Sequence, residues 1–382
     1  MKFMADDNYN NFNNYNNNYT RAGNWILAVR RDTDGIVLLR CLTRDEYAVL
    51  PDQIYGLPVI GIGDHAFAAD APIPDGGEIE LIKISGGRIS DARKSGDWIL
   101  NAREKNDHNQ AMRELLFPSG LRYIDSYAFY NCRELRKLRL YDGIAFQGGG
   151  IFMNCRELNQ IEIIQERGDQ GAAAYFAGEF NRELDMMILR PVSPRTPARS
   201  SGGEIPARYD GGGTEYEIKI RLIFPEYWEL YEENSPAHHF DYGIEGAGYL
   251  YHHCFRDRKL NLIAYDGLWN RGEDAYQRPL PIKTALKLAW RRLYYPEELY
   301  QDAEKNYKDY IYFHAKDAAE WLIRERDLSG LAFLLSEIKP DREALSDAAE
   351  LARRLNFTEA VALFLEAARG RNQKSVRDRF AL

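Results

Sequence analysis

The sequence Asn-Cys-Arg-Glu-Leu occurs twice in this chain of 382 residues, at residues 131–135 and, 23 residues later, at residues 154–158. An apolar alternation follows each copy, at residues 138–140 and 161–163. A fixed period of this length indicates a solenoid, because a single unit cannot bury its own apolar face and must stack on a neighbour. The repeat therefore restricts the central part of the chain to a stack of similar coils.

The apolar positions of the repeat predict its core. Period-2 spacing places alternate side chains on one face of a strand, and the Phe and Cys before each strand are expected to pack against the next coil. The predicted repeated core consists of Phe67, Phe129, Cys132, Leu135, Leu138, Leu140, Phe152, Cys155, Leu158, Ile161 and Ile163. Neutral Cys is compact and apolar, which favours buried free thiols at Cys132 and Cys155 over a disulfide between adjacent coils.

Weaker copies of the repeat flank the clear pair. Upstream, residues 60–67 match residues 123–129, and downstream Leu184 is followed by Met187 and Leu189 in the same spacing. Further strands are predicted at residues 79–84, 112–117 and 218–222.

The alternate strand positions are predicted to face outward and to bind a partner. They mix charge with a short apolar patch, as a protein-binding surface does. The predicted binding residues are Lys83, Lys137, Arg139, Gln160, Glu162, Met186, Ile188, Lys219 and Arg221. Charge reversal at Lys137 and Arg139 is then expected to weaken partner binding without lowering stability.

These motifs give the chain a family resemblance. Residues 60–67 read Ile-Gly-Ile-Gly-Asp-His-Ala-Phe, residues 117–121 read Phe-Pro-Ser-Gly-Leu, and residues 56–59 read Gly-Leu-Pro-Val. Over residues 24–266 the chain resembles the BspA-like class of bacterial leucine-rich repeats. The resemblance implies a leucine-rich-repeat solenoid, a β-strand ladder with short helices or turns, opened by a β-hairpin. It also implies a binding scaffold that carries no catalytic residues.

The composition shifts along the chain predict its organisation. The solenoid is placed at residues 23–268, with long inserts at residues 85–111, 191–213 and 225–248. Residues 1–22 are rich in Asn and Tyr and are expected to form a disordered tail, because such a polar sequence cannot build a core.

An all-α domain is predicted over residues 281–370, where the apolar period changes from 2 to 3.6, followed by a basic tail at residues 371–382. Asp327 and Asn356, 29 residues apart, are predicted N-caps of two equivalent helices. The pattern resembles a pair of ankyrin-type helical hairpins, although their Thr-Pro-Leu-His motif is missing. The resemblance implies a helical-repeat cap or docking module.

Charge and composition limit the classes of partner and the compartment that we expect. The formal net charge of −8 argues against nucleic acid or an anionic membrane as the main partner. The chain contains no run of about 18 apolar residues, so we expect no membrane span. Its polar start has no apolar core of the kind found in signal peptides, and its four cysteines are dispersed, which together favour a cytoplasmic protein.

No motif for catalysis or metal binding stands out. The histidines at 238–239 and 252–253 could supply zinc ligands with Cys254, but adjacent strand residues point to opposite faces and the spacing matches no zinc pattern. The glycine runs at 148–150 and 211–213 are not followed by the Lys-Ser/Thr of a phosphate-binding loop. We therefore predict no enzyme activity, no catalytic residue, no cofactor and no metal.

Two functions are predicted from these observations. The first is a non-enzymatic protein-interaction scaffold or adaptor that uses the strand face of the solenoid. The alternative is a regulatory or docking subunit of an enzyme assembly, such as an ATPase, held through the helical domain. In both, the partner is a protein of unspecified identity.

Overall fold

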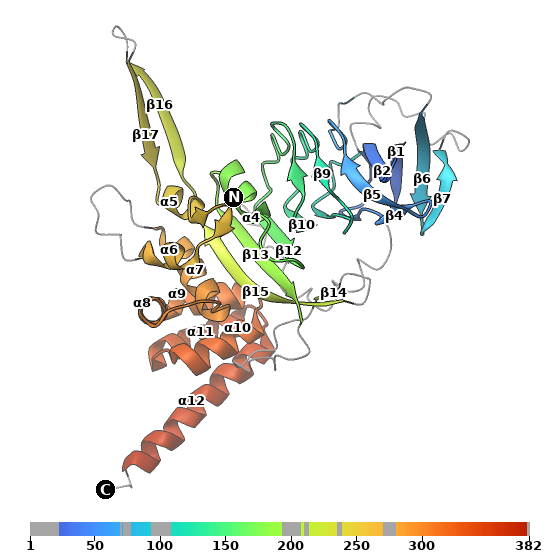
Figure 1. The fold of residues 1–382 in the computed structure, drawn as a ribbon. Helices are drawn as coiled ribbons and strands as arrows, with labels where there is room; N and C mark the ends of the chain where they lie inside the picture. Colours follow the sequence, from blue (N-terminus) through green and yellow to red (C-terminus); the bar gives the residue numbers. More distant parts are fainter. Residues whose placement is uncertain are drawn as a thin grey trace.

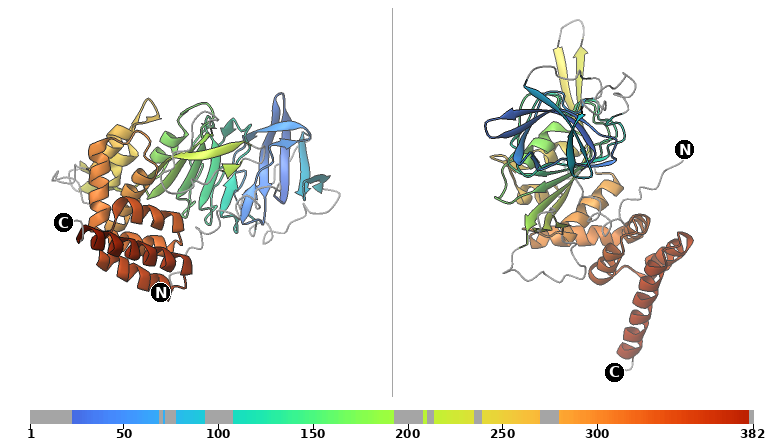
Figure 2. Two further views of the ribbon diagram at one scale, coloured as in Figure 1. Left: turned by 90° about the horizontal axis from the view of Figure 1, so that it is seen from below. Right: turned by 90° about the vertical axis from the view of Figure 1, so that its right-hand side faces the viewer.

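The computed structural model describes residues 23–68, 71, 78–92, 108–192, 208–209, 214–234, 239–269 and 280–379. A solenoid forms the first part of the chain and a group of helices follows it, which confirms the predicted architecture (Figure 1). Figure 2 shows the strands stacked side by side along the solenoid and the helices gathered at its C-terminal end.

A β-hairpin opens the solenoid, as predicted. Its strands are β1 (Trp25–Asp32) and β2 (Gly35–Leu42), which pair antiparallel. Two strands extend this sheet beyond β1 in antiparallel pairing: β6 (Ile79–Ser85) and β7 (Arg88–Asp91). The strand predicted at residues 79–84 therefore exists, but it belongs to the opening hairpin's sheet and not to a coil.

The coils begin on the other side of this hairpin. The sheet continues from β2 in parallel pairing through β5 (Leu57–Ile62), β9 (Tyr123–Ile124) and β11 (Ala145–Phe146). A short strand, β4 (Gln53–Ile54), pairs antiparallel with β5. One edge of the solenoid is thus a short parallel ladder.

A second sheet of seven strands forms the long face of the solenoid. Five of its strands are parallel: β3 (Tyr47–Val49), β8 (Glu114–Leu116), β10 (Lys137–Tyr141), β12 (Gln160–Ile164) and β13 (Leu184–Pro191). Two antiparallel strands close it: β15 (Glu215–Phe224) and β14 (Arg208–Tyr209). The parallel ladder therefore ends at β13, and the strand predicted at residues 218–222 runs against it.

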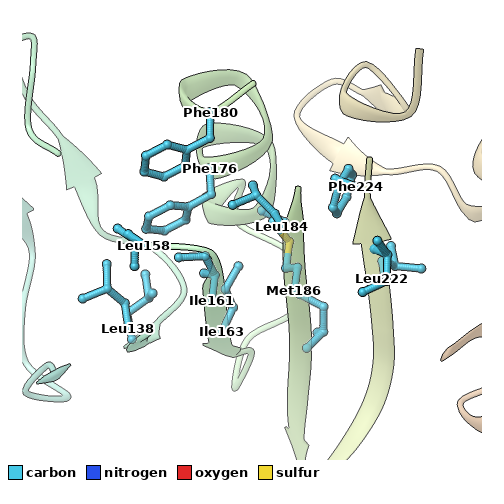
Figure 3. Packing of buried hydrophobic residues seen from close by; sticks show 14 of the residues in the cluster. Leu138, Leu158, Ile161, Ile163, Phe176, Phe180, Leu184, Met186, Leu222 and Phe224 are labelled. Carbon is cyan, nitrogen blue, oxygen red and sulfur yellow. The ribbon is translucent and has the colours of Figure 1, made fainter. Parts of the chain in front are cut away.

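Stacked phenylalanines fill the core between the sheets. Phe67 lies on Phe129 at 4.5 Å between ring centroids, and Phe129 lies on Phe152 at 5.2 Å. In the next coil α4 (Ala172–Glu179) supplies Phe176, 5.5 Å from Phe152. Figure 3 shows inward side chains of β10, β12, β13 and β15 in one row beside Phe176 and Phe180. All eleven residues predicted to form the repeated core are at most 2% exposed.

The repeated asparagines have a backbone role. Asn131 and Asn154 both adopt φ of 63°, the left-handed conformation that Asn tolerates better than most residues. The side-chain amide of Asn154 donates to the Asn131 oxygen at 3.0 Å, which links adjacent coils. The repeated motif therefore marks a left-handed turn that recurs once per coil.

The strand register of β13 differs from the prediction. Met186 pairs with Ile161 and Ile188 pairs with Ile163, so both side chains enter the core. Met186 follows Leu184 by two residues, whereas its partner Ile161 follows Leu158 by three, and a slip of one residue exchanges the two faces of a strand. The prediction that Met186 and Ile188 face outward is wrong, and Met187 and Leu189 take that face.

The three predicted inserts differ in structure. The third, at residues 225–248, contains an antiparallel hairpin of β16 (Trp228–Asn234) and β17 (His239–Glu245). Most of the first two inserts and the predicted tail at residues 1–22 lie outside the described residues. Short elements follow the hairpin: α5 (Gly248–His252), β18 (Phe255–Arg256), β19 (Lys259–Leu260) and α6 (Leu262–Gly267).

Helices make up the last part of the chain. They are α7 (Ile282–Tyr294), α8 (Gln301–Phe313), α9 (Ala315–Arg324), α10 (Leu328–Phe333), the π-helix η2 (Leu334–Ile338), α11 (Arg342–Arg354) and α12 (Thr358–Arg379). The residues of the predicted basic tail up to Arg379 continue α12. Within the described part of the chain, no helix is both long enough and apolar enough to cross a membrane.

One of the two predicted N-caps is correct. The carboxylate of Asp327 accepts the Gly330 N–H at 2.8 Å and caps α10. Asn356 instead terminates α11: its φ is 53°, its N–H donates to Arg353 O at 3.1 Å, and the Phe357 N–H donates to Ala352 O at 2.9 Å. This pattern is a Schellman-type helix end, in which Asn supplies the left-handed residue.

Candidate interaction surfaces

The centre of the strand face is a buried ion cluster. Lys137 Nζ lies 2.8 Å from Glu162 Oε1, and Arg139 Nε lies 2.6 Å from Glu162 Oε2. Lys137 also approaches Glu114 on the neighbouring strand at 3.8 Å. The Glu162 side chain is 0% exposed, and those of Lys137 and Arg139 are below 10%. These strand residues satisfy one another across adjacent coils, and the prediction that they form an exposed surface is wrong.

A second cluster continues this face at β13 and β15. Arg221 donates two hydrogen bonds to the Asp185 carboxylate, at 2.7 and 2.5 Å, and Arg291 of α7 approaches it at 3.6 Å. Burial opposes ionisation of Asp185, but the charges of Arg221 and Arg291 outweigh it, so the pKa of Asp185 is lowered. Arg221 is therefore also buried and ion-paired rather than outward-facing.

Helix α7 and the residues after it cover the C-terminal part of the strand face. Glu183 accepts from Thr284 Oγ1 at 2.7 Å and from Lys287 Nζ at 2.6 Å. An apolar cluster lies between the strands and the end of α7: Ile164, Met187, Leu189, Tyr216, Ile218 and Tyr295. The face that the sequence predicts to bind a partner is thus bound here by the chain's own helical region.

A buried ion pair fixes that region to the solenoid's last coil. Arg292 and Asp266 are both 0% exposed and share two hydrogen bonds of 2.8 Å, and Tyr307 Oη donates to Asp266 at 2.9 Å. Burial disfavours the Arg292 charge, yet Asp266 more than compensates and raises the pKa of Arg292. This carboxylate therefore joins α6, α7 and α8.

Only three of the nine predicted binding residues remain partly exposed. Lys83, Gln160 and Lys219 are in this group, and Lys219 pairs with Glu217 at 2.6 Å. Lys83 lies on β6, in the other sheet, so it is not part of the same row. The other six are buried: Lys137, Arg139, Glu162, Met186, Ile188 and Arg221.

The cysteines are structural. All four are free and buried, and Cys155 Sγ donates to Phe129 O of the adjacent coil at 3.1 Å. Burial raises the pKa of Cys155 to about 12, so the thiol stays protonated near neutral pH. The disulfide alternative between Cys132 and Cys155 is therefore not what the structure contains.

His252 also has a structural place. Its ring lies between Ala177 O, 2.8 Å from Nδ1, and Pro225 O, 2.9 Å from Nε2. Among the residues that the structure describes, no group of three or more His, Cys, Asp or Glu side chains is arranged to hold a metal ion. His238 lies outside the described residues.

The hairpin of β16 and β17 carries the main cluster of exposed apolar side chains described on the solenoid. We call it the hairpin surface, made of Trp228, Leu230, Tyr231, Tyr242 and Ile244. Trp228 is 57% exposed and Tyr231 is 69% exposed. The register places Tyr231 opposite Tyr242, with ring centroids 5.1 Å apart. By alternation, Trp228 and Leu230 lie on the opposite face of the hairpin.

The hairpin projects from a tightly packed root (Figure 1). Tyr227 is buried, and its ring meets His252 at 5.1 Å. Gly248 approaches the chain so closely that a Cβ there would lie 1.9 Å from Pro225 O. Because α5 and β15 hold both ends of the hairpin, its base has a fixed direction. Sequence reasoning treated this segment as an insert, although its aromatic density was the available signal.

The repeat region also matches a known family. The family described as "BspA type Leucine rich repeat region (6 copies)" matches residues 107–180. This chain carries a BspA-type leucine-rich repeat region. Solenoids with such repeats present extended surfaces that suit protein partners, and the BspA-type region supports a role in protein interaction in general. The ankyrin-type resemblance of the helical region stays a prediction.

One solved leucine-rich repeat structure matches part of this chain. It is the crystal structure of the T. pallidum leucine-rich repeat protein (TpLRR), whose sequence is 21% identical to this chain and whose structure matches it with a TM-score of 0.24. That match covers 38% of this chain and 55% of the T. pallidum chain, so it spans about half of that protein. Among curated proteins, none matches this chain.

Proposed function

We propose that this protein is a non-enzymatic scaffold that binds a protein partner through the hairpin surface. The observation that carries the proposal is the exposure of five large apolar side chains on a projecting hairpin. Aromatic side chains are enriched at protein interfaces, since they bury a large area and keep a polar tip. A two-stranded hairpin is marginally stable alone, so a partner that covers it would also stabilise it.

The closed strand face supports the same proposal. The ion cluster around Glu162 and the docked helix α7 leave little of that face for a partner. We propose Lys83, Gln160 and Lys219 as secondary contacts, because they keep partial exposure. Four buried free thiols are consistent with a reducing compartment such as the cytoplasm.

The proposal is tested by removing the exposed rings. Full-length protein with Trp228→Ala and Tyr231→Ala should lose the stoichiometric partner that the wild type retains in cells that normally express it. Its melting temperature should stay near that of the wild type, because both side chains are exposed. The matched control is Tyr55→Ala with Phe313→Ala, which removes two exposed rings away from the hairpin. Retention of the partner by the hairpin variant would contradict the proposal.

A groove in the helical region favours a second function, the docking subunit of an enzyme assembly. The groove lies between α11 and α12 and has a volume of about 610 Å³. Its lining combines apolar side chains, such as Leu345 and Leu365, with three arginines, Arg342, Arg353 and Arg354, and one glutamate, Glu350. This combination suits an amphipathic helix with acidic residues on an enzyme such as an ATPase. Leu365→Glu should then release that enzyme while leaving a hairpin-bound partner in place, and its retention would dismiss this function.

A further inference from the structure

We infer that the hairpin surface recognises a basic, extended protein segment that pairs with the hairpin as a third strand. This inference rests on the proposed function and names the class of partner. Three features of the hairpin carry it: its charge, its aromatic rings and its strand edges.

The charge of the hairpin segment is one-sided. Residues 226–245 contain no Lys or Arg. The acidic residues there whose side chains the structure describes are Glu226, Glu229 and Glu245. Glu226 and Glu229 are exposed, at the root and on the Tyr231 face respectively. Such a field attracts a cationic segment and repels nucleic acid or an anionic membrane.

The exposed rings suit the same partner. Lys and Arg side chains bind the faces of Trp and Tyr through cation–π attraction, and their methylene stems pack against apolar surface. Trp228 is available on one face of the hairpin, and Tyr231 and Tyr242 on the other. A strand added beside the hairpin would place alternate side chains against both faces.

The strand edges provide the backbone contacts. Among the described strands, β16 and β17 pair only with each other. A hairpin of this kind presents N–H and C=O groups along its outer edges, and an extended peptide can satisfy them by strand addition. A second copy of this hairpin would offer the same edge but would bring its own acidic residues and no Lys or Arg, which disfavours self-pairing.

Designed peptides test the inference on the full-length protein. The probes are labelled peptides of equal length with alternating Lys-Val, Glu-Val or Lys-Pro, and fluorescence anisotropy gives the Kd. The Lys-Val peptide should bind at least about tenfold more tightly than Glu-Val, with an affinity that falls as salt rises. The Lys-Pro peptide has the same charge but cannot donate backbone hydrogen bonds from proline, so it should bind more weakly than Lys-Val.

Variants locate the binding site. Trp228→Ala with Tyr231→Ala should weaken Lys-Val binding at least about tenfold, whereas Tyr55→Ala with Phe313→Ala should leave it unchanged. The inference is overturned if Lys-Val binds no better than Glu-Val or Lys-Pro, or if the hairpin variant binds it as the wild type does. It is also overturned if the wild type forms a dimer that the hairpin variant abolishes, because the occupant is then a second copy.

The two levels of the proposal can fail separately. If Lys-Val fails to bind but the hairpin variant still loses its cellular partner, the scaffold function stands and the basic-segment inference falls. If the hairpin variant keeps its cellular partner and the peptide also fails, both fall.

Discussion

At the scale of single residues, Glu162 holds two cations at once. Its fully buried carboxylate pairs with Lys137 at 2.8 Å and Arg139 at 2.6 Å. Removing one member of a buried pair leaves an uncompensated charge and costs about 3–5 kcal/mol. Glu162→Gln should therefore lower the free energy of unfolding in urea by about this amount, whereas Glu157→Gln, exposed in the same coil, should change it by less than about 0.5 kcal/mol. Equal stabilities of the two variants would contradict a buried, ion-paired Glu162.

The same cluster changes the expected effect of charge reversal at Lys137 and Arg139 on stability. Charge reversal at Lys137 and Arg139 was expected to spare stability, but both side chains are buried against Glu162. Such a reversal would place two new carboxylates beside those of Glu162 and Glu114 in the protein interior, so it should lower the free energy of unfolding in urea.

Asp185 should give the stability a dependence on acid pH. Its pKa in the folded protein is lowered below the unfolded value of about 3.9. Its contribution is therefore fully present above that value and is lost as the pH falls through the lower folded pKa. Asp185→Asn should be less stable than the wild type at neutral pH, by about 3–5 kcal/mol. Urea denaturation at several pH values should show this difference shrinking below about pH 4, and a constant difference would refute the assignment.

At the scale of elements, substitutions of Asn356 distinguish its role as the left-handed residue that ends α11 from the predicted role as an N-cap. A left-handed residue favours Gly and disfavours Ser, whereas an N-cap favours Ser. We expect Asn356→Gly to keep or raise the thermal stability and Asn356→Ser to lower it by about 1 kcal/mol. Asp341 is the matched true cap, since it accepts the Ala344 N–H at 2.8 Å, and Asp341→Ser should be tolerated. Tolerance of Ser at both positions would restore the N-cap interpretation of Asn356.

How far the sequence predicts the elements depends on the kind of information each one needs. The strand that contains Leu138 and Leu140 can be predicted from the apolar alternation, because that pattern depends only on neighbouring residues in the sequence. The direction of β15 is not local: its alternation looks the same whether it runs parallel or antiparallel to β13. The register of β13 depends on the spacing from Leu184 to Met186, which is one residue shorter than that from Leu158 to Ile161, and the apolar pattern at Met186 and Met187 cannot reveal it.

At the scale of the whole molecule, the candidate site is set by which surfaces the chain covers for itself. The strand face is closed by its own ion pairs and by α7, and neither contact is visible in a linear pattern because Glu183 and Lys287 lie 104 residues apart. The hairpin surface stays open because it projects from the solenoid (Figure 1). The fold was therefore largely predictable from the repeat, whereas the free surface required the packing of distant segments.

Site-specific photo-cross-linking in cells that normally express the protein would show which of its surfaces contacts the partner. A photoreactive residue would replace Tyr231 on the hairpin, Lys219 on the strand face or Phe313 on α8, each in the full-length chain. We expect a dominant cross-linked protein from position 231, a weaker yield of the same protein from position 219, and none from position 313. A partner that cross-links from position 219 or 313 but not from 231 would contradict binding through the hairpin surface.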